Sequence, residues 1–172
     1  MGSPPFRRIA VAVDGSRFAE AALGYGITVA RKFASELVVL TVAPLATYVV
    51  ATEPWVPTEI LEGEVRHYRE ILAAAGARAR SEGVVSVSEV FLEGPVTDEI
   101  VGYLEKNPAE LLIMGSRGQS AAKRLLLGST SDAVLHHVAC AVLIVRLPAA
   151  APPPSPSPTP PPPAGPAVAG SG

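Results

Sequence analysis

The chain has almost no cysteine, since only one of its 172 residues is of this type. A single cysteine excludes an internal disulfide and a cysteine-based zinc cluster, and it suits a reducing compartment. Charged residues are also few, at 17%, and the formal net charge is only −2. So weak a charge gives no reason to expect nucleic acid or an anionic membrane as a partner.

We also expect neither a targeting signal nor a membrane span. The apolar run before Asp14 is five residues long, whereas the apolar region of a secretory signal takes roughly 7–15 residues. Phe6 stands where an N-myristoylation motif requires Ser or Thr. The uncharged run 37–52 contains Pro44 and is shorter than the ~18 apolar residues of a spanning helix. We therefore expect a soluble, cytoplasmic protein.

The composition changes at Pro148. From there to Gly172 the chain has no charged and no aromatic residue, and 11 of its 18 prolines fall in these 25 residues. Such a segment cannot bury enough apolar surface to offset the entropy of ordering. We predict a folded domain over residues 1–147 and a disordered, proline-rich tail over 148–172 with polyproline II character. The tail is either a spacer or, alternatively, a proline-rich ligand, although it lacks a neighbouring Arg or Lys.

Strand and helix patterns alternate through residues 1–147. Apolar residues at helical spacing predict helices that begin after Ser16, near Leu61, after Pro95 and at Ser131. Short apolar or alternating runs predict five strands, at 8–13, 36–42, 86–93, 111–115 and 141–146. Five such strands alternating with four helices indicate an α/β fold, with a parallel sheet covered by helices on both faces.

A glycine-rich segment follows the strand predicted at 111–115. It contains Gly115, Gly118 and Gly128, and the last is followed directly by Ser129 and Thr130. In open α/β sheets, ligands bind beyond the carboxyl ends of the strands. Glycine lets backbone N–H groups approach phosphate oxygens that a Cβ would obstruct, and the start of the last helix favours an anion. The segment therefore suggests a phosphate site.

Charged residues near these glycines extend the hypothesis to a nucleotide. Asp14 ends the first strand at the same edge and suits ribose hydroxyls, while Arg117, Lys123 and Arg124 supply positive charge. Each feature alone has a simpler explanation: a turn residue for Asp14, a solvated face for Lys123 and Arg124, a strand-end turn for the first glycine, and helix caps for the two hydroxyls. Their convergence on one edge favours the site. The P-loop and dinucleotide fingerprints are both absent.

The spacing Gly115-x2-Gly118-x9-Gly128-Ser129 resembles the ATP-binding signature G-2x-G-9x-G-[ST] of the universal stress protein family. The similarity covers about residues 6–147, from RRIAVAVDGS to LLLGSTSDAVLHHVACAVLIVR. It implies an open five-stranded parallel sheet of order 3-2-1-4-5, Rossmann-like and similar to adenine nucleotide alpha hydrolases, with ATP and Mg²⁺ as ligands. The implied binding residues are Ala12, Asp14, Val42, Met114, Gly115, Arg117, Gly118, Gly128, Ser129 and Thr130.

The resemblance also implies how parts of this site are used. Asp14 would contact the adenosine portion with Ala12 beside it, and the backbone of Val42 would bond the adenine edge. Met114 would line the ribose–phosphate region with the first glycine, and the later glycines and hydroxyls would hold the phosphates. Family members commonly pair through the last strand, so we expect a homodimer through Ala141–Arg146. Here Cys-Ala-Val replaces the family's frequent Cys-Pro-Val before this strand.

The sequence offers no set of side chains for catalysis. ATP hydrolysis needs a positioned base and usually a metal held by carboxylates. Helix capping is enough to explain Asp132. His136 and His137 lie away from the start of the last helix, and Cys140 has the apolar neighbours of a buried core residue. We therefore predict an ATP-binding stress-response or signalling module. The alternatives are a slow ATPase using the same pocket, and a nucleotide-free dimeric scaffold acting through its surface and tail.

Overall fold

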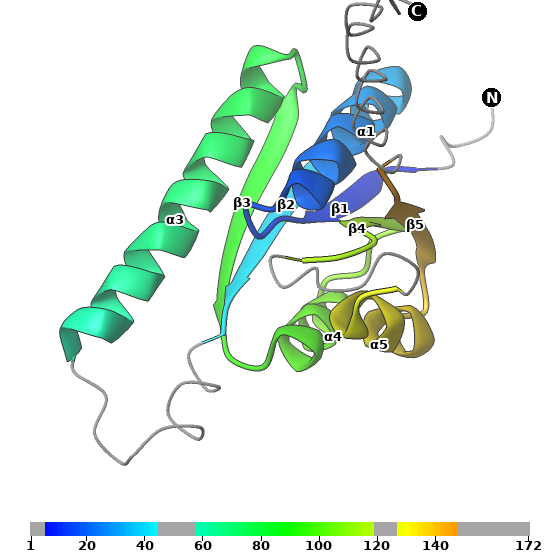
Figure 1. Ribbon diagram of the computed structural model, residues 1–172. Helices are drawn as coiled ribbons and strands as arrows, with labels where there is room; N and C mark the ends of the chain where they lie inside the picture. Colours follow the sequence, from blue (N-terminus) through cyan, green and yellow to red (C-terminus); the bar gives the residue numbers. More distant parts are fainter. Residues whose placement is uncertain (1–5, 45–57, 119–126, 148–172) are drawn as a thin grey trace, which may run out of the picture.

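The computed structural model describes residues 6–44, 58–118 and 127–147 (Figure 1). The proline-rich segment 148–172, Lys123 and Arg124 lie outside these ranges. Within them, no helix has the length and apolar character needed to cross a membrane. The elements in chain order are β1 (Arg8–Ala12), α1 (Arg17–Phe33), β2 (Glu36–Ala43), α3 (Thr58–Ser81), β3 (Ser86–Glu93), α4 (Val96–Lys106), β4 (Leu111–Gly115), α5 (Ser129–His137) and β5 (Ala141–Val145).

The five strands form one parallel sheet of order β3-β2-β1-β4-β5. This confirms the predicted fold class and strand order. The central strand β1 is paired on both sides, since Ile9 lies opposite Leu37 of β2 and opposite Leu111 of β4. The strand order reverses between β1 and β4, which creates the crevice where open α/β sheets bind ligands.

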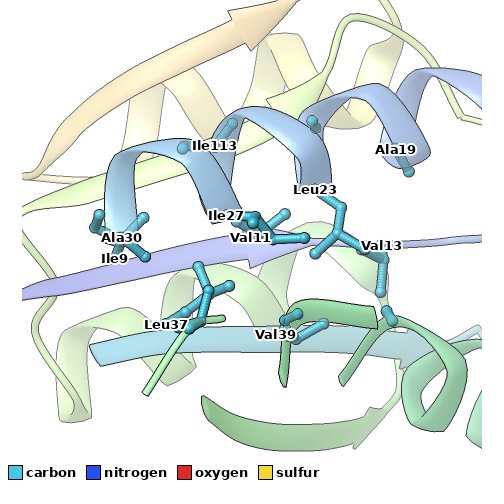
Figure 2. Packing of buried hydrophobic residues seen from close by; sticks show 14 of the residues in the cluster. Ile9, Val11, Val13, Ala19, Leu23, Ile27, Ala30, Leu37, Val39 and Ile113 are labelled. Atoms are coloured by element: carbon cyan, nitrogen blue, oxygen red, sulfur yellow. The ribbon is translucent and has the colours of Figure 1, made fainter. Parts of the chain in front are cut away.

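Helices cover both faces of this sheet, as predicted (Figure 1). Because side chains alternate along a strand, Val11 packs with Leu23 and Ile27 of α1 on one face, and α3 joins the same core cluster. Figure 2 shows these side chains meeting between α1 and β1. On the other face, Ala10 and Leu112 pack in a second cluster with residues of α4 and α5.

Helix α1 follows β1 after a tight turn at the carboxyl edge of the sheet. Gly15 adopts φ 78°, a conformation that glycine takes without steric cost. The Ser16 hydroxyl then accepts a hydrogen bond from the Ala19 N–H at 3.2 Å, which confirms the predicted N-cap. Further along, a Cβ at Gly26 would overlap the Val11 side chain, so glycine lets α1 lie close to β1.

Helix α5 begins two residues earlier than predicted, at Ser129 instead of Ser131, and it ends at His137. Its N-cap is Gly128, whose C=O accepts from the Asp132 N–H at 2.9 Å. The interpretation of Ser129 and Thr130 as caps is therefore wrong, since both lie in the first turn. A side chain at the cap would be crowded, because a Cβ at Gly128 would lie 3.3 Å from the Arg117 Cα.

Candidate functional site

A cavity of about 260 Å³ lies at the carboxyl ends of β1, β2 and β4. The starts of α1, α4 and α5 and one residue of α3 complete its wall. The structure brings all ten residues of the predicted nucleotide site to this one cavity, and their roles toward a ligand stay predictions. These residues are Ala12, Asp14, Val42, Met114, Gly115, Arg117, Gly118, Gly128, Ser129 and Thr130.

Asp14 both shapes the turn after β1 and lines the cavity. Its Oδ1 accepts a hydrogen bond from the Ser16 N–H at 2.9 Å, so the turn interpretation is correct. Its Oδ2 faces Gly118 so closely that a Cβ there would lie 2.7 Å away. The first half of the chain and the glycine segment therefore meet at this carboxylate.

Gly115 has a reason to be glycine that does not involve a ligand. A Cβ at this position would lie 2.7 Å from the Phe18 Cβ and 2.8 Å from the Phe18 carbonyl carbon. The first turn of α1 therefore packs directly on the end of β4, and any side chain would push it away. The Gly115 C=O also accepts a buried hydrogen bond from Ser131 Oγ at 2.9 Å, which ties α5 to the same strand end. Packing is thus sufficient to require glycine here.

One end of the cavity is polar and favours an anion. The first turn of α5 brings Ser129 and Thr130 to this end, and N–H groups in a first helical turn have no acceptor within the helix. The helix dipole adds partial positive charge. Arg117 lines the same end, with its guanidinium 5.9 Å from the centre of the Phe18 ring. The Gly128 N–H donates to the Ser116 C=O at 2.8 Å, which holds the start of α5 against this loop.

The other end of the cavity is apolar. Leu40 and Val42 of β2 line it together with Met114 of β4, and Val96 and Ile100 of α4 close it from the side. All five side chains belong to, or pack against, the core cluster under α4 and α5. This end therefore offers aliphatic surface on which a flat apolar group can lie.

The backbone of β2 adds polar groups to the apolar end. Leu40 accepts a hydrogen bond from the Val13 N–H at 2.9 Å, so its C=O points toward β1. Backbone groups alternate between the two sides of a strand, and those of Val42 therefore point to the same side as those of Leu40. Because β1 ends at Ala12, Val42 lies beyond the part of β2 that pairs with β1. Its backbone N–H and C=O are therefore directed toward the cavity.

The cavity is also lined by eight residues that the sequence analysis did not assign to the site. Strand ends in an α/β fold are a usable signal, and it would have found Val13 and Thr41. Tyr68 and Ile100 carry no such signal, because their helical spacing is that of ordinary core residues. The full set is Val13, Ala19, Leu40, Thr41, Tyr68, Val96, Ile100 and Ser131.

The cavity lining does not include Asp132, His136, His137 or Cys140, the residues considered above for catalysis. Asp132 is paired with His136 at 3.9 Å, and both side chains are exposed. Cys140 is half-buried, less than the buried core position expected, and burial raises the pKa of its thiol. Over residues 6–44, 58–118 and 127–147, no three His, Cys, Asp or Glu side chains are grouped as a metal site.

Comparison with known proteins gives concordant matches. The model of the universal stress protein family matches residues 5–146. Universal stress protein MJ0531 of Methanocaldococcus jannaschii is 31% identical over 154 residues, which cover 86% of each chain. A solved universal stress protein in complex with cAMP has a TM-score of 0.59 and 25% identity over 82% of this chain and 97% of that one. A universal stress protein from Archaeoglobus fulgidus in complex with dAMP has a TM-score of 0.60 and 21% identity over 81% and 97%.

Proposed function

The chain belongs to the universal stress protein family, and we propose that it binds an adenine nucleotide, ATP above all, in the cavity at the carboxyl edge of its sheet. The observation that carries the proposal is the division of this cavity into an apolar and an anion-favouring end. A nucleotide has the same division, since its base is flat and largely apolar and its phosphates are charged. Asp14 lies at the junction of β1 with the glycine segment, where a ribose would be placed.

The base fits the apolar end. Val42 would bond the adenine edge through its backbone, and Ala12 of β1 would lie beside the adenosine portion, while Met114 of β4 would line the ribose–phosphate region. A donor and an acceptor on one backbone stretch suit adenine, whose edge carries an amino group beside a ring nitrogen. The complexes of two related folds with cAMP and with dAMP support this assignment, because both ligands contain adenine.

The phosphates fit the polar end. Gly118 and Gly128 would leave room for them beside the backbone, and Ser129 and Thr130 would donate from the start of α5. Arg117 would supply a full positive charge. Mg²⁺ bound with ATP would be held mostly by phosphate oxygens and water, the usual arrangement for this ion.

A binding site of this kind suits a regulator. We propose that nucleotide occupancy changes the contacts of the protein within a cytoplasmic stress or signalling response. The homodimer would form through β5, an edge strand of the sheet where Leu143 is 37% exposed. Exposed edges are available for pairing with another chain.

The direct test has two parts. Purified protein is denatured and any released nucleotide is identified by chromatography, and ATP, AMP and cAMP are titrated with Mg²⁺ by calorimetry. We expect ATP binding by the wild type and its loss in a Gly118→Val, Gly128→Val double variant. The matched control is Gly63→Val, Gly102→Val, because a Cβ at either of these helical glycines meets nothing within 4 Å. Absence of both released nucleotide and ATP binding in the wild type would overturn the proposal.

A further inference from the structure

Tyr68 is a cavity residue that belongs neither to the glycine segment nor to a strand end. It lies on α3, is 9% exposed, and is the only aromatic side chain among the described residues that line the cavity. It precedes Leu72 by one helical turn, and Leu72 packs in the core cluster under α1 and α3. Tyr68 therefore lies where α3 passes from the protein core to the cavity.

The length of α3 places Tyr68 level with the end of β2. The helix runs from the carboxyl edge of the sheet, where β2 ends, to the amino edge, where β3 begins. From Tyr68 to Ser81 the helix rises about 20 Å, and β2 from Glu36 to Ala43 spans about 23 Å. The buried residues of α3 begin at Tyr68. The preceding segment 58–67 contains no buried residue and extends past this level.

Aliphatic side chains lie near the end of β2 on the opposite face of the sheet. Helices α3 and α4 cover opposite faces (Figure 1), so Tyr68 and Val96 flank the end of β2 from two directions. Both line the same cavity as Val42. A flat base bonded to the Val42 backbone would therefore have the phenol ring on one side and aliphatic groups on the other. Aromatic side chains stabilise bound nucleobases by stacking on them, and they do so for every base because each base has a π-face.

We infer that Tyr68 is a specificity-determining residue whose ring contacts the base of the bound nucleotide, so that the ligand holds α3 against the cavity. The inference rests on the proposed function and adds α3 to the site. It has two consequences. Replacing the ring weakens binding more for a purine than for the smaller pyrimidine, and bound nucleotide slows backbone opening in segment 58–72, where α3 leaves the core.

The experiment compares the wild type with Tyr68→Phe, Tyr68→Leu and Tyr68→Ala, using ATP and CTP with Mg²⁺ in calorimetry. Loss of the ring should lower ATP affinity about tenfold, the scale of one stacked base, with a smaller loss for CTP. Tyr68→Phe keeps the ring and should stay within about threefold of the wild type. Tyr25→Ala is the matched control, because Tyr25 is 55% exposed on α1. Should Tyr68→Ala fail to fold, Tyr68→Leu preserves the buried bulk.

Hydrogen exchange followed by mass spectrometry tests the second consequence. ATP should slow exchange in peptides from 58–72 of the wild type and of Tyr68→Phe, and have little effect there in Tyr68→Leu. If the wild type binds ATP but Tyr68→Leu binds it equally well, or loses ATP and CTP by the same factor, Tyr68 has only a packing role and the inference is overturned. If the wild type binds no adenine nucleotide, the proposed function fails first and this inference fails with it.

Discussion

Asp14 and Gly118 lie so close together that a Cβ at Gly118 would be 2.7 Å from Asp14 Oδ2. The carboxylate is not free to turn, because its Oδ1 accepts a hydrogen bond from the Ser16 N–H. Gly118→Ala should therefore displace Asp14 and lower ATP affinity by about tenfold, which is ~1.4 kcal/mol. Calorimetric titration measures the change. Gly102→Ala, at an open position in α4, should bind ATP as the wild type does, and equal affinities for all three proteins would contradict the prediction.

Gly115→Ala should destabilise the fold itself. The new Cβ would meet the backbone and Cβ of Phe18 within 2.8 Å. The backbone of a helix cannot move aside without disturbing the packing of the whole helix. We expect a loss of about 1–3 kcal/mol in the free energy of unfolding, the usual cost of overpacking. Urea denaturation gives the value. Gly102→Ala should instead gain stability, since alanine favours a helix over glycine by roughly 0.8–1 kcal/mol. An unchanged unfolding midpoint in Gly115→Ala would show that α1 can shift freely.

Asp14 variants separate its turn role from its proposed ribose contact. Asp14→Asn keeps an oxygen for the Ser16 N–H, so its stability should stay within about 0.5 kcal/mol of the wild type. Asp14→Ala loses this bond and should cost about 1 kcal/mol. The wild type should prefer ATP over 2′,3′-dideoxy-ATP, and Asp14→Ala should remove the preference. A preference that survives in Asp14→Ala would place the ribose elsewhere.

Glu110 should make stability pH-dependent at the amino edge of the sheet. The Arg8 N–H donates to Glu110 Oε2 at 2.7 Å and lowers the pKa of this carboxyl, with a smaller contribution from Arg7. A depressed pKa in the folded state stabilises the protein above the pKa of an unfolded glutamate, about 4.3, and the stabilisation is lost as the pH falls through the lower folded value.

Glu110→Gln should therefore unfold at lower urea than the wild type at pH 7, and the two curves should converge toward pH 3. Urea titrations at several pH values measure the difference. The control is Glu105→Gln, at an exposed glutamate of α4, which should shift little at any pH. A Glu110→Gln effect that is constant from pH 7 to pH 3 would mean that the carboxylate charge is not the cause.

Much of the site was predictable because its residues carry local patterns. The strand ends and the glycine spacing are visible in the chain, and they predicted Asp14, Arg117, the three glycines and the two hydroxyl residues after Gly128, which the structure brings to one cavity. Ala12, Val42 and Met114 were implied only by the resemblance to the family. Tyr68 could not be found this way. Its spacing from Leu72 is that of a helix packed on a core, and the sequence does not reveal that the sheet ends beneath it.

The alternation of strands and helices follows from the sequence alone, because periods of two and 3.6 depend on local backbone geometry. The sequence also determines where glycine occurs. The neighbour that each glycine accommodates is visible only in the folded protein: Gly115 makes room for α1, Gly118 for the Asp14 carboxylate, and Gly128 for the loop at Arg117. These neighbours come from distant parts of the chain, and their proximity depends on how the helices pack across the sheet. Local patterns in the sequence do not indicate such distances.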